Sequence, residues 1–393
     1  MAASLPYPWA KRLLRPDVLM LEASAPILDL PELDRLQRRL GGTLRLLEVG
    51  DAFARSELGA KIEAAARAAA DKTAGLELGV SVLVPGVSLE KSLFALKKQL
   101  RAEGVRVRIV LPQEGAVLST AQVGGNKLAA AQHGAGRIEL MVLPDGESYR
   151  LARTLTVQDI EDYTLRDFKI PNPDPLSGML NPKVAQTMLN LAIGKRDPKK
   201  TVVYDPFCGN GRIMLEARLM GATSFGSDIS TEKVDATREN LRWLATEYSL
   251  GLESAPEHLV WDRDATKESA VGDIERRLRF GHSNKRFLIV SEPYLGKPYR
   301  SPLSPEEATA WQAEVMPAYE RFLGVWANSA IKPYRMVLVF PRAKLKGGKE
   351  LALLAGIVDR LSQMGYHADM VAEYGRPDAV ICRDIVVLSP LSE

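Results

Sequence analysis

Short apolar runs alternate with stretches of helical periodicity throughout the C-terminal half of the chain. The runs predict strands at 202–204, 224–226, 259–261, 287–290 and 336–340. The intervening stretches predict helices at 183–194, 212–220, 232–248, 273–279, 305–330 and 350–364. Strands separated by helices predict an α/β fold with a doubly wound, mainly parallel sheet. Two last strands, near 370–371 and 380–382, flank Gly375-Arg376-Pro377-Asp378 and predict an antiparallel hairpin on the sheet edge.

The N-terminal half has a different, α+β pattern. Strands are expected at 18–21, 44–49, 80–84, 105–110 and 138–142. Helices are expected at 32–40, 54–72, 88–101 and 119–132. The double glycine Gly41-Gly42 is a signal for the end of the first of these helices.

A chain of 393 residues has room for two to three domains. The pattern divides it into a ferredoxin-like α+β module at 1–50, a second α+β domain at 51–157, a connector at 158–182 and an α/β domain at 183–393. Four prolines restrict the backbone of the connector, which predicts a stiff, extended segment. They are Pro171, Pro173, Pro175 and Pro182.

Charge and cysteine usage narrow the function classes. A net charge of +3 is too small for a nucleic-acid footprint spread over the whole chain, so any such footprint must be local. Cys208 and Cys382 form neither a disulfide framework nor a metal knuckle, and the four histidines have no ligand spacing, so no metal site is expected. The absence of an apolar span or leader predicts a cytoplasmic protein without a membrane segment.

One glycine-rich turn carries the strongest chemical signal. Asp205-Pro206-Phe207-Cys208-Gly209-Asn210-Gly211 follows a strand and opens a helix, and Gly209 and Gly211 allow the backbone to approach a ligand closely. By itself the turn also fits plain packing of a helix on a strand. Asp205 favours a ligand with an ammonium group, and the chain has no Gly-Lys-Ser/Thr triplet for phosphates. Cys208 is interpreted as a small packing residue in this turn.

Acidic residues also follow the next two strands. Asp228 is placed to bind ribose hydroxyls, and Asp264, with Ala265 beside it, is placed to reach an adenine amino group, although Asp262 is an alternative. Helix capping is the competing interpretation for Asp205 and Asp228. Three strand tips with carboxylates and no phosphate clamp fit S-adenosylmethionine better than NAD or ATP.

The turn resembles the cofactor loop of class I methyltransferases, specifically the THUMP-domain RNA guanine methyltransferases. The segments 157–163, 166–167, 178–186 and 190–192 resemble the sequence before that loop in the archaeal and eukaryotic enzymes that modify the position-ten guanosine of tRNA. The resemblance covers residues 79 to 300. It implies a Rossmann-like, seven-stranded class I domain, S-adenosylmethionine as cofactor and tRNA as partner.

The segment from Lys91 to Lys127 is basic, with seven positive residues against Glu103 and Glu114. A solvated basic face is one interpretation. The segment also resembles a THUMP domain, which implies RNA binding through sequence-independent phosphate contacts. The candidate RNA-binding residues are Lys91, Lys97, Lys98, Arg101, Arg106, Arg108 and Lys127. Arg376 and Arg383, near the last hairpin, are further candidates for RNA contact or for simple solvation.

Ser291-Glu292-Pro293-Tyr294 ends the fourth strand, where amino-methylating class I enzymes have Asp/Asn-Pro-Pro-aromatic. In that pattern an acceptor orients the exocyclic amine and the aromatic residue stacks on the flipped base. Here the acceptor is Glu292 or Ser291, and a carboxylate that takes both amine hydrogens favours Glu292. A degenerate site that binds without catalysis is the alternative.

These features together predict an S-adenosylmethionine-dependent enzyme that methylates the exocyclic N2 amine of a tRNA guanosine, at position ten. A DNA amino-methyltransferase acting on adenine or cytosine and a non-catalytic tRNA-binding protein are the alternatives. A small activator subunit remains compatible with the chain.

Overall fold

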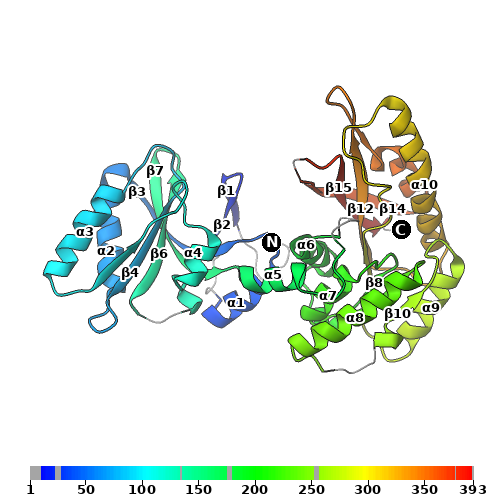
Figure 1. Cartoon of the computed structure of the whole chain (residues 1–393), viewed down its shortest axis with the longest axis horizontal. Coiled ribbons are helices and arrows are strands. Elements are labelled where there is room, and N and C mark those ends of the chain that lie inside the picture. The colour runs from blue at the N-terminus through cyan, green and yellow to red at the C-terminus, as the bar shows by residue number, and fades with distance from the viewer. Residues whose placement is uncertain are drawn as a thin grey trace. The chain divides into compact units, whose positions relative to one another are not determined.

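The computed structural model describes residues 10–22, 28–132, 135–174, 179–251, 256–376 and 378–391. The chain divides into two compact units between Tyr163 and Thr164. Figure 1 shows a sheet with helices in each unit.

The first unit is built on a five-stranded sheet with the order β3-β7-β6-β4-β5. β4 is parallel to β5 and β6, whereas β7 is antiparallel to both β3 and β6. The elements are β1 (Ala10–Arg15), β2 (Val18–Glu22), α1 (Leu30–Arg39), β3 (Arg45–Ala54), α2 (Leu58–Ala69), β4 (Leu76–Val82), α3 (Glu90–Ala102), β5 (Val107–Val110), α4 (Thr120–Gly125), β6 (Arg137–Asp145) and β7 (Ser148–Val157).

Alternation along the strands fixes which face α2 and α3 cover. Ile138, Leu140 and Val142 of β6 belong to the core under these two helices, while Met141 and Leu143 belong to a smaller cluster on the other face. α2 and α3 lie side by side along the sheet in Figure 1.

The first unit differs from its sequence interpretation in three places. The strands β1 and β7 were not expected, and β3 crosses the predicted boundary at residue 50. The helix expected at 119–132 is shorter, because α4 ends after Gly125 and Lys127 adopts a positive φ of 55°. The chain then forms only a short 3-10 turn at Ala130–Gln132.

The second unit contains the predicted doubly wound sheet. The strand order is β10-β9-β8-β11-β12-β15-β14, in which the first five strands are parallel and β15 is antiparallel to both of its neighbours. This third-second-first-fourth-fifth-seventh-sixth order confirms the class I, Rossmann-like fold. A short β13 pairs with β12 outside this path.

The elements of the second unit, with α5 crossing the division, are α5 (Ile160–Phe168), α6 (Pro182–Ile193), β8 (Thr201–Asp205), α7 (Arg212–Leu219), β9 (Thr223–Asp228), α8 (Thr231–Glu247), β10 (Val260–Asp262), α9 (Glu268–Arg279), β11 (Arg286–Ser291), α10 (Pro305–Ala327), β12 (Arg335–Lys344), β13 (Glu350–Ala352), α11 (Val358–Gln363), β14 (Tyr366–Tyr374) and β15 (Ile381–Pro390).

Both faces of this sheet are buried, as a parallel sheet requires. Val202 and Tyr204 of β8 face a large core shared with α8, α9 and α10, while Val203 faces the core shared with α6. The strand sequences are therefore nearly continuous apolar runs rather than alternating ones. This is why the apolar runs in the sequence predicted these strands.

Two expectations need correction in the second unit. The predicted helix 350–364 is instead β13, a 3-10 turn at Leu354–Gly356 and the short α11. The connector predicted as extended begins with a helix, α5, because the residues before Pro171 carry no φ restriction. Pro175 and Gly178 lie outside the described residues. The antiparallel hairpin of the two last strands is confirmed as β14 and β15, with Pro377 in its connection outside the described residues.

Candidate functional site

The glycine-rich turn connects the end of β8 to the start of α7. Gly209 and Gly211 have φ values of 51° and 89°, a region that L-residues rarely adopt. A Cβ on Gly211 would lie 2.7 Å from Cγ2 of Thr237, so this glycine is required for packing on α8. A Cβ on Gly209 would meet no atom within 4 Å, which leaves open space over the backbone of the turn.

Asp205 is the last residue of β8 and its side chain is buried. Its Oδ1 accepts a hydrogen bond of 2.5 Å from Oγ of Ser291 and one of 3.3 Å from the amide of Phe207. Burial raises the pKa of Asp205 to about 7, against the lowering effect of these two hydrogen bonds. The fold thus holds a carboxylate that is costly to ionise unless a cation joins it.

Asp228, at the end of β9, binds the same turn. Its Oδ2 accepts a hydrogen bond of 2.9 Å from the amide of Gly209, and its Oδ1 accepts one of 3.0 Å from the amide of Ser230. Asp228 does not cap α8, because the N-cap is Ser230, whose hydroxyl accepts from the amide of Lys233. Each oxygen retains a lone pair, because a carboxylate oxygen accepts up to two hydrogen bonds.

The carboxylate at the third strand tip, Asp264, accepts two hydrogen bonds on the same oxygen. Oδ1 of Asp264 accepts hydrogen bonds from the amide and the hydroxyl of Thr266, at 2.9 and 2.7 Å. Partial burial acts to raise the pKa of Asp264, but these hydrogen bonds and the charge of Lys267 outweigh it and lower the pKa. Ala265 is buried next to it, while Asp262 at the end of β10 is exposed.

Phe207 and Cys208 attach the turn to α10 and to β9. The Phe207 ring meets the Phe322 ring of α10 edge-on, with centroids 5.2 Å apart. The Cys208 amide donates to the carbonyl of Ser227, and burial raises the pKa of its thiol. A buried thiol of raised pKa is a poor nucleophile, which agrees with the packing role expected for Cys208.

The tetrapeptide at the end of β11 lies on the same sheet edge. Ser291 is buried, and its hydroxyl is used in the hydrogen bond to Asp205. The Glu292 carboxylate is largely buried and paired with the guanidinium of Arg383 on β15. Burial raises the pKa of Glu292 although the neighbouring Arg383 acts to lower it.

The second half of the tetrapeptide is partly open. Pro293 is buried, whereas Tyr294 is 48% exposed. The Tyr294 hydroxyl donates a hydrogen bond of 2.6 Å to Glu314 on α10, and this bond is the first cause that raises the pKa of Tyr294 to about 12. An exposed ring held at its far end presents a flat face for stacking.

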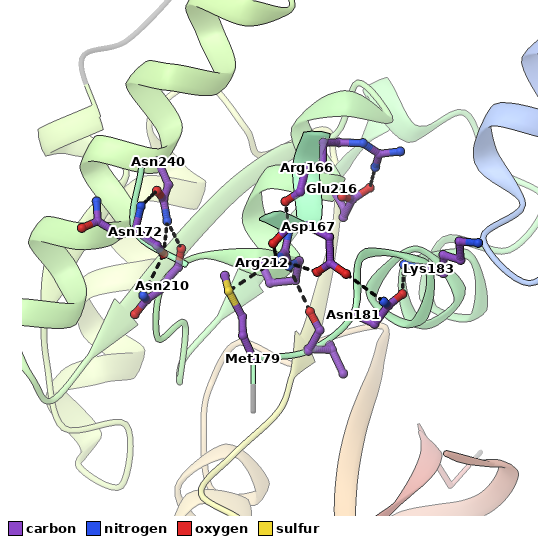
Figure 2. Close-up of polar contacts among 11 residues, drawn as sticks. Arg166, Asp167, Asn172, Met179, Asn181, Lys183, Asn210, Arg212, Glu216 and Asn240 are labelled. Carbon is purple, nitrogen blue, oxygen red and sulfur yellow. Dashed lines mark hydrogen bonds and ion pairs between the residues drawn. The ribbon is translucent and has the colours of Figure 1, made fainter. Parts of the chain in front are cut away.

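Sequence reasoning did not find an asparagine cluster that holds the connector against the turn (Figure 2). Nδ2 of Asn210 donates to the carbonyl of Asn172 at 2.9 Å, and the amide of Asn172 donates to Oδ1 of Asn240 at 2.9 Å. Nδ2 of Asn240 in turn donates to the carbonyl of Asn210 at 2.9 Å. Only the position of Asn210 in the turn offered a signal, since Asn240 is 30 residues away on α8.

Arg212, the first residue of α7, extends this attachment (Figure 2). Its guanidinium donates to the carbonyls of Leu180 and Arg166, at 2.9 and 2.5 Å, and to Oδ1 of Asp167 at 3.2 Å. Arg166 itself forms a buried ion pair with Glu216 on α7. The segment that precedes the α/β sheet is therefore hydrogen-bonded directly to the glycine-rich turn and to the start of α7.

The seven candidate RNA-binding residues of the first unit fall into three groups. Lys91, Lys97, Lys98 and Arg101 are on α3, Arg106 and Arg108 are at β5, and Lys127 follows α4. Arg101, Arg106 and Arg108 line one hollow of about 530 Å³. Arg108 is 3.6 Å from Glu77, so part of its charge is neutralised.

The described residues offer neither a metal-binding cluster nor a helix that could span a membrane. No three His, Cys, Asp or Glu side chains in that part of the chain are grouped so that they could hold a metal ion. Of the described helices, none combines the length and the apolar character needed to cross a membrane.

Comparisons with known proteins agree with the geometry of the turn. Residues 172–277 match the family described as "RMKL-like, methyltransferase domain". The tRNA (guanine(10)-N2)-dimethyltransferase of Methanothermobacter thermautotrophicus is 39% identical over 97 residues, which are 24% of this chain and 27% of that protein. The enzyme of the same name from Methanocaldococcus jannaschii is 41% identical over 73 residues, 19% of each chain.

The matched segments thus span about a quarter or less of these relatives' own length. The crystal structure of TrmN from Thermus thermophilus is similar at 19% identity with a TM-score of 0.44, and the likeness covers 88% of this chain and 82% of that chain. The second unit has the class I fold by its strand order, and its residues 172–277 are similar to a methyltransferase-domain family.

Proposed function

We propose that this protein is an S-adenosylmethionine-dependent tRNA methyltransferase that acts on the exocyclic N2 amine of a guanosine, at position ten. The observation that carries the proposal is the edge where Asp205, Asp228 and Ser291 converge on the open backbone of Gly209. The relatives that share this segment are named for that reaction.

The residues of the turn fit the cofactor. Asp205 is the partner for its ammonium group, Asp228 has lone pairs left for the ribose hydroxyls, and Asp264 is the candidate for the adenine amino group. The open space above Gly209 suits close approach of the ligand, and the carboxylates would repel a phosphate-bearing one. Bound S-adenosylmethionine supplies an electrophilic methyl group.

The substrate amine is proposed to bind at Glu292. Its lone pair is delocalised into the base, so an acceptor that orients both amine hydrogens favours a tetrahedral nitrogen facing the methyl group. With S-adenosylmethionine bound, the amine nitrogen would gain a bond to the methyl carbon as the carbon–sulfur bond of the sulfonium breaks and a neutral thioether leaves. The nitrogen would give up one proton, for which the Glu292 carboxylate is the proposed acceptor. Arg383 is a positioning residue, because its guanidinium fixes one oxygen of that carboxylate. Tyr294 provides the stacking face for the flipped base.

The first unit is proposed to bind the tRNA through a THUMP-like domain. The exposed cations of α3 and β5 suit phosphate contacts, which position an RNA without reading its bases. A non-catalytic tRNA-binding protein is the second candidate. One observation favours this second candidate. Ser291-Glu292 stands where the usual pattern has Asp-Pro, and Glu292 is already paired with Arg383.

The proposal is tested by incubating the purified chain with unmodified tRNA and labelled S-adenosylmethionine, followed by nucleoside mass spectrometry. We expect N2-methylguanosine with the wild type and none with Asp205→Ala or Glu292→Ala. Glu247→Ala, which changes an exposed glutamate on α8, is the matched control and should retain full activity. Cofactor binding without methylation of any tRNA would favour the non-catalytic candidate, and methylation of DNA alone would favour the DNA amino-methyltransferase.

A further inference from the structure

A basic hollow of about 790 Å³ lies at the sheet edge opposite the cofactor turn, within the second unit. It is formed where β11 and β12 begin and β15 ends, and Lys200 immediately precedes β8. The register pairs Arg286 with Thr201 and Leu288 with Arg335, which places these strand starts side by side. Asp205 is the fifth and last residue of β8, so it lies a span of about 17 Å from Lys200 along the strand.

The lining of this hollow has one sign of charge. It contains six cations and no aspartate or glutamate. None of the six forms an ion pair with a carboxylate of the described residues. The cations are Arg196, Lys200, Lys285, Arg286, Lys332 and Arg335.

Helix ends explain two of these cations only in part. Nζ of Lys332 donates to the carbonyl of Ala327 at the end of α10, and Nη1 of Arg335 donates to the carbonyl of Leu191 in the last turn of α6. Cations at helix C-termini are a common stabilising arrangement. It does not neutralise them, however, and Nε of Arg335 is buried without a hydrogen-bond partner. Arg196 and Lys200 are exposed and serve no helix end in this way.

An aromatic ring is placed among these charges. Tyr334 is 47% exposed, the guanidinium of Arg286 lies 3.3 Å from its ring centroid, and that of Arg335 lies 5.6 Å away. A concave site that combines unpaired guanidinium and ammonium groups with an exposed ring has the chemistry used for single-stranded or looped nucleic acid.

We propose that this hollow binds backbone phosphates of the RNA substrate, as a second contact surface on the catalytic unit itself. The proposal rests on the proposed function for the identity of the RNA. Because the hollow faces away from the reacting edge, it contributes to holding the RNA and not to methyl transfer. Its contribution is sequence-independent and depends on salt.

The test uses the double variant Arg196→Gln/Lys200→Gln and labelled tRNA in anisotropy titrations at several salt concentrations. Each lost phosphate contact should reduce the log-log salt slope by about one, so the double variant should lose about two and bind on the order of 10-fold more weakly. Ser283→Glu, which adds a carboxylate to the same lining, should also weaken binding. The turnover number at saturating tRNA and the affinity for S-adenosylmethionine should stay unchanged.

Arg242→Gln/Arg360→Gln is the matched control, because it removes two exposed arginines that are already paired with Glu257 and Glu320. An unchanged tRNA affinity and slope in the hollow variants would overturn the proposal. Saturable binding of inorganic pyrophosphate with unchanged tRNA affinity would also overturn it, in favour of a small-anion site. Wild-type protein that methylates no tRNA would contradict the proposed function alone, since tRNA binding by the hollow is measured separately.

Discussion

The two edges of one sheet differ in the sign and the burial of their charges. At the carboxyl ends of the strands, the carboxylate of Asp205 is buried and that of Glu292 is largely buried, and burial raises the pKa of both. At the amino ends, Arg196 and Lys200 are exposed cations without carboxylate partners among the described residues. The carboxylates at the carboxyl ends therefore carry a free-energy cost of desolvation, whereas the cations at the amino ends remain hydrated.

Because of this difference, ligand binding at the two edges should respond to different solution conditions. A buried titratable group responds to pH, because protonation relieves its desolvation. An exposed cation responds to ionic strength, because salt screens it and competes for its anionic partner. Cofactor binding and methyl transfer should depend on pH, whereas attachment of RNA to the opposite edge should depend on salt.

The largest expected effect concerns the pair at the reacting edge. Arg383→Met removes the cation that favours the ionised form of Glu292, so the pKa of Glu292 rises further and less of the acceptor is ionised at pH 7. We expect the turnover number at pH 7 to fall on the order of 100-fold and to recover partly as the pH is raised. The measurement is the pH profile of turnover at saturating substrates.

The pH profile separates two roles for Arg383. A loss of equal size at every pH would mean that the arginine acts only on packing or on RNA, not on the ionisation of Glu292. Circular dichroism of the variant is the folding control, because loss of one partner from a buried ion pair destabilises a protein by roughly 3–5 kcal/mol.

The next largest effect concerns Asp205, where one substitution should lower cofactor affinity and raise the melting temperature. Asp205→Asn retains an oxygen that can accept the Ser291 hydrogen bond but has no charge for an ammonium group. Affinity for S-adenosylmethionine, measured by calorimetry, should fall on the order of 10- to 100-fold. The free protein should nevertheless melt at a higher temperature than the wild type at pH 8, because the buried charge is gone. A lower Tm at pH 8 would contradict a destabilising carboxylate at this position.

The sign of the pH effect on stability follows from the raised pKa. The folded state keeps a proton on Asp205 up to a pKa of about 7, whereas the unfolded chain releases it near the ordinary value of 3.8. The folded state thus binds more protons between these values, and the stability due to Asp205 is lost as the pH rises through 7. In Asp205→Asn this part of the pH dependence should disappear.

The same pKa predicts a smaller effect in the wild type. Because the ammonium group binds only the ionised carboxylate, affinity for S-adenosylmethionine should fall about tenfold from pH 8 to pH 6. Calorimetric titrations at these two values measure it, and Asp205→Asn serves as the control with a flat profile. A flat profile in the wild type would mean that Asp205 is already ionised at pH 6.

The sequence indicated which residues would gather at one edge of the sheet, but it gave hardly any indication of those at the other. Asp205, Gly209 and Asp228 are close in the chain and follow strands of strong apolar pattern, so their convergence could be inferred from strand order. The partner of Glu292 is 91 residues away on the antiparallel β15, and no local pattern indicates that pairing. The cations of the opposite edge come from three separate segments, each of which resembles ordinary surface sequence.

The fold, too, was predicted well in some parts and missed in others. Parallel strands and their helices were recognised because both faces are buried and the apolar runs are long. The helix expected at 350–364 was wrong, because β13 is held by pairing of Leu351 with Ala343 of β12, a contact that helical periodicity does not reveal. The asparagine cluster around Asn172 was missed for a similar reason, since its hydrogen bonds join three segments distant in sequence.

The smallest expected effect is the response of cofactor affinity to salt. A charge pair inside the protein is screened much less than an exposed one, so raising salt from 50 to 200 mM should change the affinity for S-adenosylmethionine by less than about twofold. Over the same range the affinity for tRNA should fall steeply, because each phosphate contact releases counterions. Parallel titrations of both ligands measure the contrast. If cofactor affinity fell as steeply as tRNA affinity, the carboxyl edge would have to be open to solvent, and the division into a pH-controlled and a salt-controlled edge would fail.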